Sequence, residues 1–92
     1  MALSQSITIL YFAAASTSTG LTTETVPIPE SGSLPLNDLP KILISRHPNA
    51  SGLNDILESS QWSIDAEMVE EPERVVLKGG EEVAVICPVS GG

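Results

Sequence analysis

The chain has 92 residues, and four Lys and Arg against twelve Asp and Glu give it a formal net charge of −8. A chain this short makes one domain, which we place at residues 1–92, and its core is too small to enclose a large catalytic cavity. The acidity argues against nucleic acid and anionic membranes as partners, because binding to both depends on Lys and Arg.

The N-terminal part of the chain predicts two strands around a short helix. Ser6–Phe12 combines β-branched and aromatic residues and is apolar on both faces, which is typical of a central strand. Ala13–Thr19 is rich in alanine and predicts a helix that ends at Gly20. Thr22–Ile28 predicts an edge strand, because Pro27 has no N–H to donate to a neighbouring strand.

The middle of the chain predicts the main helix. Between Leu36 and Leu43 the apolar side chains recur at helical spacing. We expect the helix to begin near Asp38, which leaves Pro40 in the first turn, where proline is tolerated. We expect it to end at His47, because the proline that follows disfavours helix in the residue before it.

The C-terminal part predicts mainly strands. Leu53–Glu58 is expected to form a turn of helix, and Gln61–Val69 a half-buried strand, because its apolar and polar residues alternate. Glu70–Glu73 is expected to be a charged turn and Val75–Leu77 a short extended segment. Glu82–Val89 is apolar on both faces and predicts a second central strand.

These elements predict an α+β fold. The two strands that are apolar on both faces come from opposite ends of the chain and belong side by side at the centre of a sheet. One main helix is then expected to cover one face of this mixed sheet. The expected arrangement is of the β-grasp kind.

The sequence favours a cytosolic protein. The apolar segment Ile7–Ala15 is not expected to be a secretory signal, because no Lys or Arg precedes Lys41. No apolar run approaches the roughly 20 residues of a membrane-spanning helix. The single cysteine, Cys87, offers no internal disulfide, which is consistent with a reducing compartment.

No group of residues indicates catalysis. His47 is expected at the surface, where it suits the negative end of the main helix, and Cys87 is expected to be a small packed residue. No His, Cys, Asp or Glu residues have the spacing of metal ligands, so no metal site is predicted. We therefore expect a protein that is not an enzyme on its own.

Seven of the twelve acidic residues lie between Asp65 and Glu82. The simplest interpretation is a solvated face that keeps the protein soluble. The alternative is a surface that steers the docking of a basic partner.

The last five residues, Pro88-Val89-Ser90-Gly91-Gly92, directly follow a predicted central strand. When extended, they span about 16 Å. Glycine lacks a Cβ, so such an arm can thread a narrow channel and present a terminal carboxyl group unhindered. A carboxylate is a poor electrophile and must first be activated, for example by joining to AMP. The arm therefore predicts a carried substrate whose reacting group belongs to Gly92.

Three blocks of sequence carry a family resemblance: Ile9–Ala13, Arg46–Pro48, and Glu82–Ile86 leading into Pro88–Gly92. With them, the chain resembles the small, sulfur-carrier subunit of molybdopterin synthase over nearly its whole length. The resemblance implies a ubiquitin-like β-grasp fold. It also implies that an E1-like enzyme adenylates Gly92, and that sulfur from a rhodanese-type donor converts Gly92 to a thiocarboxylate.

The same resemblance implies a protein partner and a substrate. The arm, with Pro88, Val89, Ser90 and Gly91, would enter the active site of a large catalytic subunit, in a heterotetramer of two small and two large chains. There it would deliver sulfur to cyclic pyranopterin monophosphate, and two transfers would build the dithiolene of molybdopterin. The chain itself would hold no metal or permanent cofactor, only a transient AMP adduct and transient sulfur.

Two features depart from the family pattern. Cys87 stands where the family often has a second proline, and Gly79-Gly80 replaces part of its usual turn. Neither change touches the reacting carboxyl group.

Phe12 has two open interpretations. As an aromatic residue near a strand end beside the arm, it would anchor the large subunit. Alternatively, it is simply part of the core.

Other functions are compatible with the same sequence. With the same fold and arm, the chain would deliver sulfur for tRNA thiolation or thiazole synthesis, or act as a ubiquitin-like protein modifier. A different class is a passive acidic interaction domain in which Gly91 and Gly92 have no role.

Overall fold

The computed structural model describes residues 5–50 and 52–87. Within these ranges the chain forms a five-stranded sheet, a two-stranded sheet and three α-helices. The strands are β1 (Ser6–Tyr11), β2 (Thr23–Pro27), β3 (Leu34–Pro35), β4 (Gln61–Ile64), β5 (Glu67–Met68), β6 (Val76–Leu77) and β7 (Glu82–Ile86). The helices are α1 (Ala13–Thr19), α2 (Leu39–Arg46) and α3 (Leu53–Ser59).

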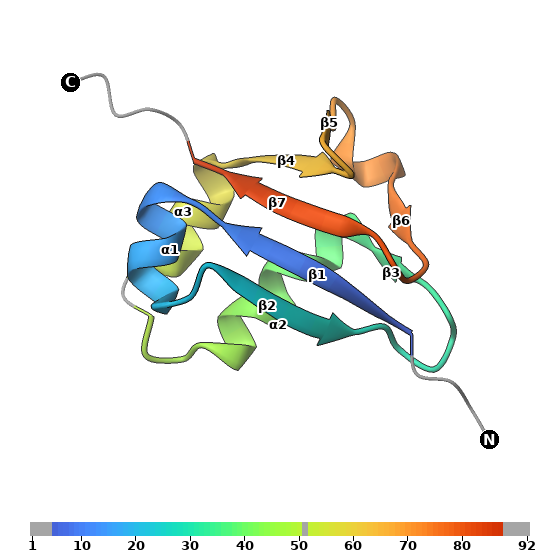
Figure 1. Cartoon of the computed structure of the whole chain (residues 1–92), viewed down its shortest axis with the longest axis horizontal. Helices are drawn as coiled ribbons and strands as arrows, with labels where there is room; N and C mark the ends of the chain where they lie inside the picture. The colour runs from blue at the N-terminus through green and yellow to red at the C-terminus, as the bar shows by residue number, and fades with distance from the viewer. Residues whose placement is uncertain (1–4, 51, 88–92) are drawn as a thin grey trace.

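The large sheet has the order β2-β1-β7-β4-β5 (Figure 1). β1 and β7 are parallel neighbours, with Ile9 beside Val83 and Tyr11 beside Val85. This confirms the prediction that the first and last strands lie side by side at the centre. β2 is an edge strand, as Pro27 predicts, and pairs antiparallel with β1.

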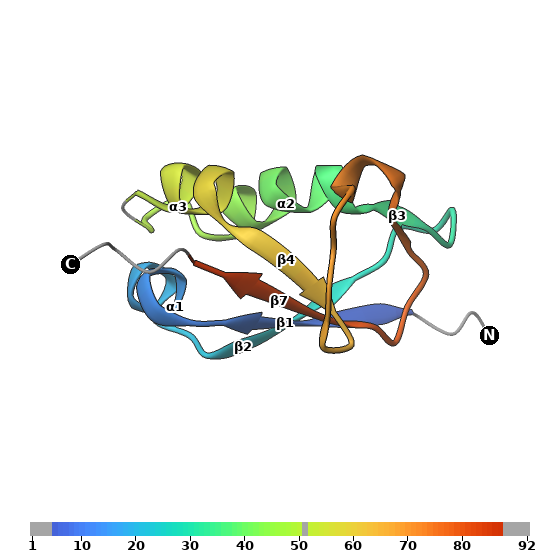
Figure 2. The same ribbon diagram turned by 90° about the horizontal axis from the view of Figure 1, so that it is seen from above.

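The core lies between the large sheet and the helices α2 and α3, which share one face of it (Figure 2). Alternate residues of β1, Ile7, Ile9 and Tyr11, are buried on this face. From α2, Leu39 and Leu43 are fully buried against them, which confirms the main helix. In the described residues no helix covers the other face of the sheet (Figure 2).

The prediction of one strand over Gln61–Val69 is wrong. The segment folds back on itself as a hairpin of β4 and β5. Asp65 and Ala66 form the turn and have positive φ angles of 51° and 72°. The N–H of Val69 then donates to the carbonyl of Trp62 at 2.9 Å, which closes the hairpin.

The small sheet pairs β3 with β6 in antiparallel orientation. β6 lies within Val75–Leu77, the segment that was expected to be extended. β3 was not predicted. Leu34 and Leu77 are opposite each other in this sheet and both are buried. Within residues 5–50 and 52–87 we find no helix with the length and apolar character needed to cross a membrane.

Candidate functional site

The base of the predicted arm lies at the end of the sheet where β1 and β7 both finish (Figure 1). β7, the middle strand of five, ends at Ile86, and Cys87 is the last residue described. The arm itself, Pro88–Gly92, lies outside the described residues. Its point of attachment is therefore a strand that is hydrogen-bonded on both sides.

Cys87 is held against the end of β1. Its thiol donates to the carbonyl oxygen of Phe12, with Sγ 3.3 Å from the oxygen, and the Ser60 hydroxyl oxygen lies 3.8 Å from Sγ. Cys87 is partly buried and packs against the core, as predicted. This hydrogen bond holds Cys87, at the base of the predicted arm, against the end of β1.

Apolar side chains cross the uncovered face of the sheet. Pairing across four strands places Leu10, Ala84, Ser63 and Met68 in one row. One step towards the arm, strand alternation places Phe12 and Ile86 on the same face. We call the apolar members of this group the apolar patch: Leu10, Phe12, Met68, Ala84 and Ile86.

The exposure of Phe12 excludes one of its two interpretations. Its side chain is 48% exposed, and Met68 on the far side of the patch is 52% exposed. The alternative in which Phe12 belongs to the core is therefore wrong. An exposed aromatic residue beside the base of the arm is the kind of residue that anchors a protein partner.

A partly buried carboxylate, that of Glu24, connects β1, β2 and the end of α2. Glu24 is 9% exposed, and it accepts hydrogen bonds from the Tyr11 hydroxyl at 2.6 Å, Arg46 Nε at 2.6 Å and His47 Nε2 at 2.7 Å. The prediction that His47 is a surface residue is wrong, because its side chain is only 17% exposed and is hydrogen-bonded to Glu24. Sequence reasoning missed this cluster, which lies at the same end of the sheet as the base of the arm.

The charges in this cluster are set by their surroundings. Burial raises the pKa of Glu24, but the hydrogen bonds from His47, Tyr11 and Arg46 outweigh burial and hold the pKa below its ordinary value of 4.5. Burial, together with the hydrogen bond to Glu24, raises the pKa of Tyr11 far above its ordinary value. Glu24 therefore stays ionised and Tyr11 stays a neutral donor at neutral pH.

We expect Glu24→Gln to lower the free energy of unfolding by about 2 kcal/mol at pH 7, because charge-assisted hydrogen bonds are lost. A lowered folded-state pKa contributes stability above the unfolded-state value of 4.5 and loses it as the pH falls. The difference from wild type should therefore shrink below pH 4.5 in urea unfolding curves. Glu30→Gln, at an exposed carboxylate, is the control. Equal stability of wild type and Glu24→Gln at pH 7 would contradict this prediction.

Comparisons with curated proteins find full-length relatives. The chain is 37% identical over 89 residues to the molybdopterin synthase sulfur carrier subunit of Mycosarcoma maydis, covering 95% of this chain and 94% of the relative. It is 42% identical over 94 aligned positions to the protein of the same name from Aspergillus niger, covering 100% of both. No family model matches the chain.

Solved structures share the fold. SAMP1 from Haloferax volcanii superposes with a TM-score of 0.74 at 22% identity, covering 95% of this chain and 99% of that chain. A chain of the protein–protein complex of subunits 1 and 2 of molybdopterin-converting factor from Helicobacter pylori superposes with a TM-score of 0.61 at 17% identity, covering 95% and 99%. The expected ubiquitin-like β-grasp fold is thereby confirmed.

Proposed function

The chain belongs to the family of molybdopterin synthase sulfur carrier subunits, and we propose that it carries sulfur on its own Gly92. An E1-like enzyme joins the Gly92 carboxyl group to AMP and releases pyrophosphate from ATP. A persulfide sulfur from a rhodanese-type donor then displaces AMP, and reductive cleavage of the resulting S–S bond by a thiol leaves a thiocarboxylate. AMP and sulfur are transient on the chain, which requires no resident cofactor in this scheme.

The position of β7 is the single observation that carries this proposal. β7 lies at the centre of the sheet, and the chain passes from it through Cys87 directly into Pro88. Because the thiol of Cys87 is hydrogen-bonded to the end of β1, the arm starts from a fixed point. A rigid body with a thin reactive arm suits a substrate that is loaded on one protein and used in another.

The partner in this proposal is the large catalytic subunit of molybdopterin synthase. The solved Helicobacter pylori complex of two subunits supports a partner of this kind. We place the contact on the apolar patch, where the exposed side chains of Phe12 and Met68 lie on the uncovered face of the sheet. In a heterotetramer of two small and two large chains, Pro88, Val89, Ser90 and Gly91 enter the active site of the large subunit.

The chemistry of sulfur insertion then takes place in the large subunit, so this chain is no enzyme on its own. Two successive thiocarboxylates give their sulfur to cyclic pyranopterin monophosphate and complete the dithiolene of molybdopterin. The names of the relatives favour this substrate over tRNA or thiazole, and over protein modification. The proposal keeps the cytosolic location that the sequence predicts.

A reconstituted reaction tests the proposed function. Chain that carries the thiocarboxylate is mixed with the large subunit and cyclic pyranopterin monophosphate, and molybdopterin is measured. We expect two loaded chains to be consumed for each molybdopterin formed, and no product from unloaded chain. Absence of product with the loaded chain, or efficient thiolation of tRNA in its place, would contradict the proposal.

A further inference from the structure

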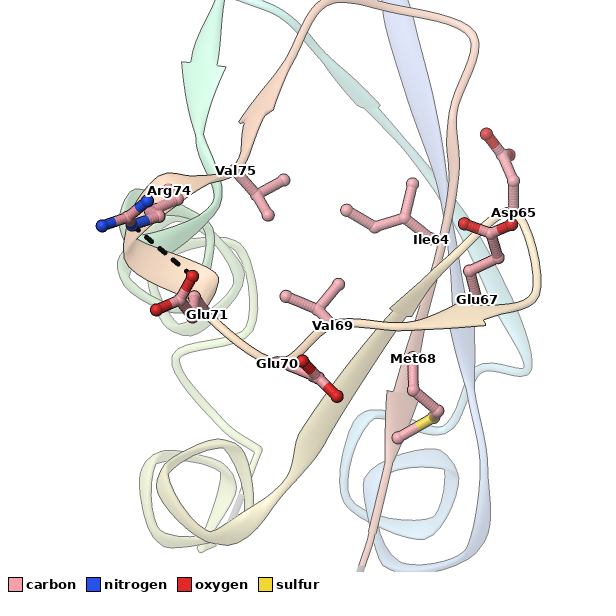
Figure 3. A pocket seen from close by; sticks show the side chains of 9 residues that line it. All are labelled: Ile64, Asp65, Glu67, Met68, Val69, Glu70, Glu71, Arg74 and Val75. Atoms are coloured by element: carbon pink, nitrogen blue, oxygen red, sulfur yellow. Dashed lines mark ion pairs between the residues drawn. The ribbon is translucent and has the colours of Figure 1, made fainter.

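A groove of about 570 Å³ lies between the β4–β5 hairpin and the helical turn at Pro72–Arg74, and Met68 of the apolar patch lines it (Figure 3). It has an apolar base and a charged rim. At its base, Ile64, Val69 and Val75 point toward one another (Figure 3). These three side chains are partly buried and pack against the core, so the shape of the groove is already set by the fold.

The rim of the groove is acidic. Four carboxylates line it against one cation: Asp65, Glu67, Glu70 and Glu71 against Arg74. Figure 3 shows the pair of Glu71 and Arg74 on one side and Asp65 with Glu67 on the other.

Two of these carboxylates are already engaged. Asp65 accepts a hydrogen bond from the N–H of Glu82 at 3.0 Å, and Glu71 lies 3.5 Å from Arg74. The carboxylates of Glu67 and Glu70 have neither a hydrogen bond nor an ion pair within the described residues. A neutral N–H does not cancel the charge of Asp65, so among the described residues the groove presents three negative charges without a paired cation beside its apolar base.

This combination selects one kind of occupant. In the part of the chain that the structure describes, no three His, Cys, Asp or Glu side chains are grouped to hold a metal ion. Nucleic acid and anionic lipid are repelled by the rim. A lysine or arginine side chain has a long apolar stem and a cationic head, and so matches both the base and the rim.

A second hollow, of about 630 Å³, lies alongside and shares Met68, Val69 and Glu70 with the first. It adds Trp62 and the carboxylate of Glu58 to the apolar and acidic surface. Two adjoining hollows of this size suit a stretch of polypeptide better than a single small cation.

Met68 connects the groove to the apolar patch, because it lines the groove and lies in the row of Leu10 and Ala84. We propose that the groove receives a basic segment of the large catalytic subunit, with an arginine or lysine stem on Val69 and Val75 and its charged head beside Glu67 and Glu70. This inference rests on the proposed function, because it takes the same partner. It extends the apolar contact with the carboxylates of the groove. Their attraction for basic residues speeds the association of the two proteins.

The test measures the binding of the full chain to the large subunit at low and high salt. We expect the double variant Glu67→Gln/Glu70→Gln to associate about tenfold more slowly at low salt, and with a weaker salt dependence. The matched control is Glu30→Gln/Asp55→Asn, which removes the same charge at two exposed sites outside the groove. We expect the control to change the association rate by about twofold or less.

Arg74→Gln makes the opposite change in charge, because it removes the cation from the rim of the groove. Its side chain is 77% exposed, so the substitution should leave folding nearly unchanged while it makes the groove more acidic. We expect faster association. If the groove variants and the control associate at equal rates and with equal salt dependence, the inference about the groove is wrong, and the proposed docking of the apolar patch is unaffected. Failure of the wild-type chain to bind the large subunit would overturn both this inference and the proposed docking.

Discussion

A chain lengthened by one residue beyond Gly92 is expected to lose sulfur transfer by more than about 100-fold, because misplacing a reacting group by even 1 Å has an effect of that size. In the lengthened chain the Gly92 carbonyl belongs to an amide, which cannot be joined to AMP. The new terminal carboxyl group stands one residue further out. Any added residue other than glycine also places a side chain beside it. The measurement is molybdopterin formed in the complete system of activating enzyme, sulfur donor and large subunit.

The matched control for this variant is one residue added before Met1. It changes the length of the chain equally and leaves Gly92 as it is. We expect thermal unfolding of both variants to match wild type, because neither change touches the packed core. Full activity of the chain lengthened after Gly92 would support the passive interaction domain and contradict the carrier.

Phe12→Ala is expected to weaken binding to the large subunit by about 2 kcal/mol, or roughly 30-fold in Kd. An exposed aromatic ring buries a large apolar area when a partner covers it. Phe12 also precedes α1 directly and its carbonyl holds the thiol of Cys87, so the ring is presented from a fixed position. Calorimetric titration of the two proteins measures the change.

Val76→Ala is the matched control, because Val76 is 45% exposed but lies in the small sheet, outside the apolar patch. We expect its affinity for the large subunit to equal that of wild type. If Phe12→Ala unfolds, Phe12→Leu keeps an apolar side chain and should show an intermediate loss. An unchanged affinity of the folded Phe12→Ala protein would remove Phe12 from the interface.

Much of the fold could be predicted because its central elements have strong patterns. β1 and β7 are apolar on both faces, a pattern that indicates strands in the middle of a sheet. They do lie there, although in the described residues helices cover only one face of the sheet. The leucines of α2 repeat at helical spacing and a proline marks its end. Pro27 likewise identified β2 as an edge strand.

The β4–β5 hairpin was missed because alternation along Gln61–Val69 fits one long strand as well as two short ones. The turn uses Asp65 and Ala66 at positive φ, where Asn-Gly or Asp-Gly would be the usual signal. A single strand over Gln61–Val69 would place Met68 on the face of Trp62, whereas the hairpin places it opposite Ser63 on the uncovered face. Strands of two residues, such as β3, are too short for any period to appear.

The cluster at Glu24 was missed for a different reason. Its partners lie 13 to 23 positions away in the sequence, and only the fold brings them together. A weak signal existed, because Glu24 is the single charged residue in the predicted strand Thr22–Ile28. The arm is a different case, since the hypothesis for Gly92 comes from residue types alone and stays a prediction, because Pro88–Gly92 lies outside the described residues.

Mass spectrometry of the chain after incubation with the activating enzyme, ATP and a sulfur source tests the central claim most directly. Replacement of one carboxyl oxygen by sulfur adds about 16 Da, and we predict this gain on the C-terminal peptide that ends in Gly92. Omission of ATP should abolish the gain. An unchanged mass, or a gain of about 32 Da from a persulfide on Cys87 alone, would contradict the claim that Gly92 carries the sulfur.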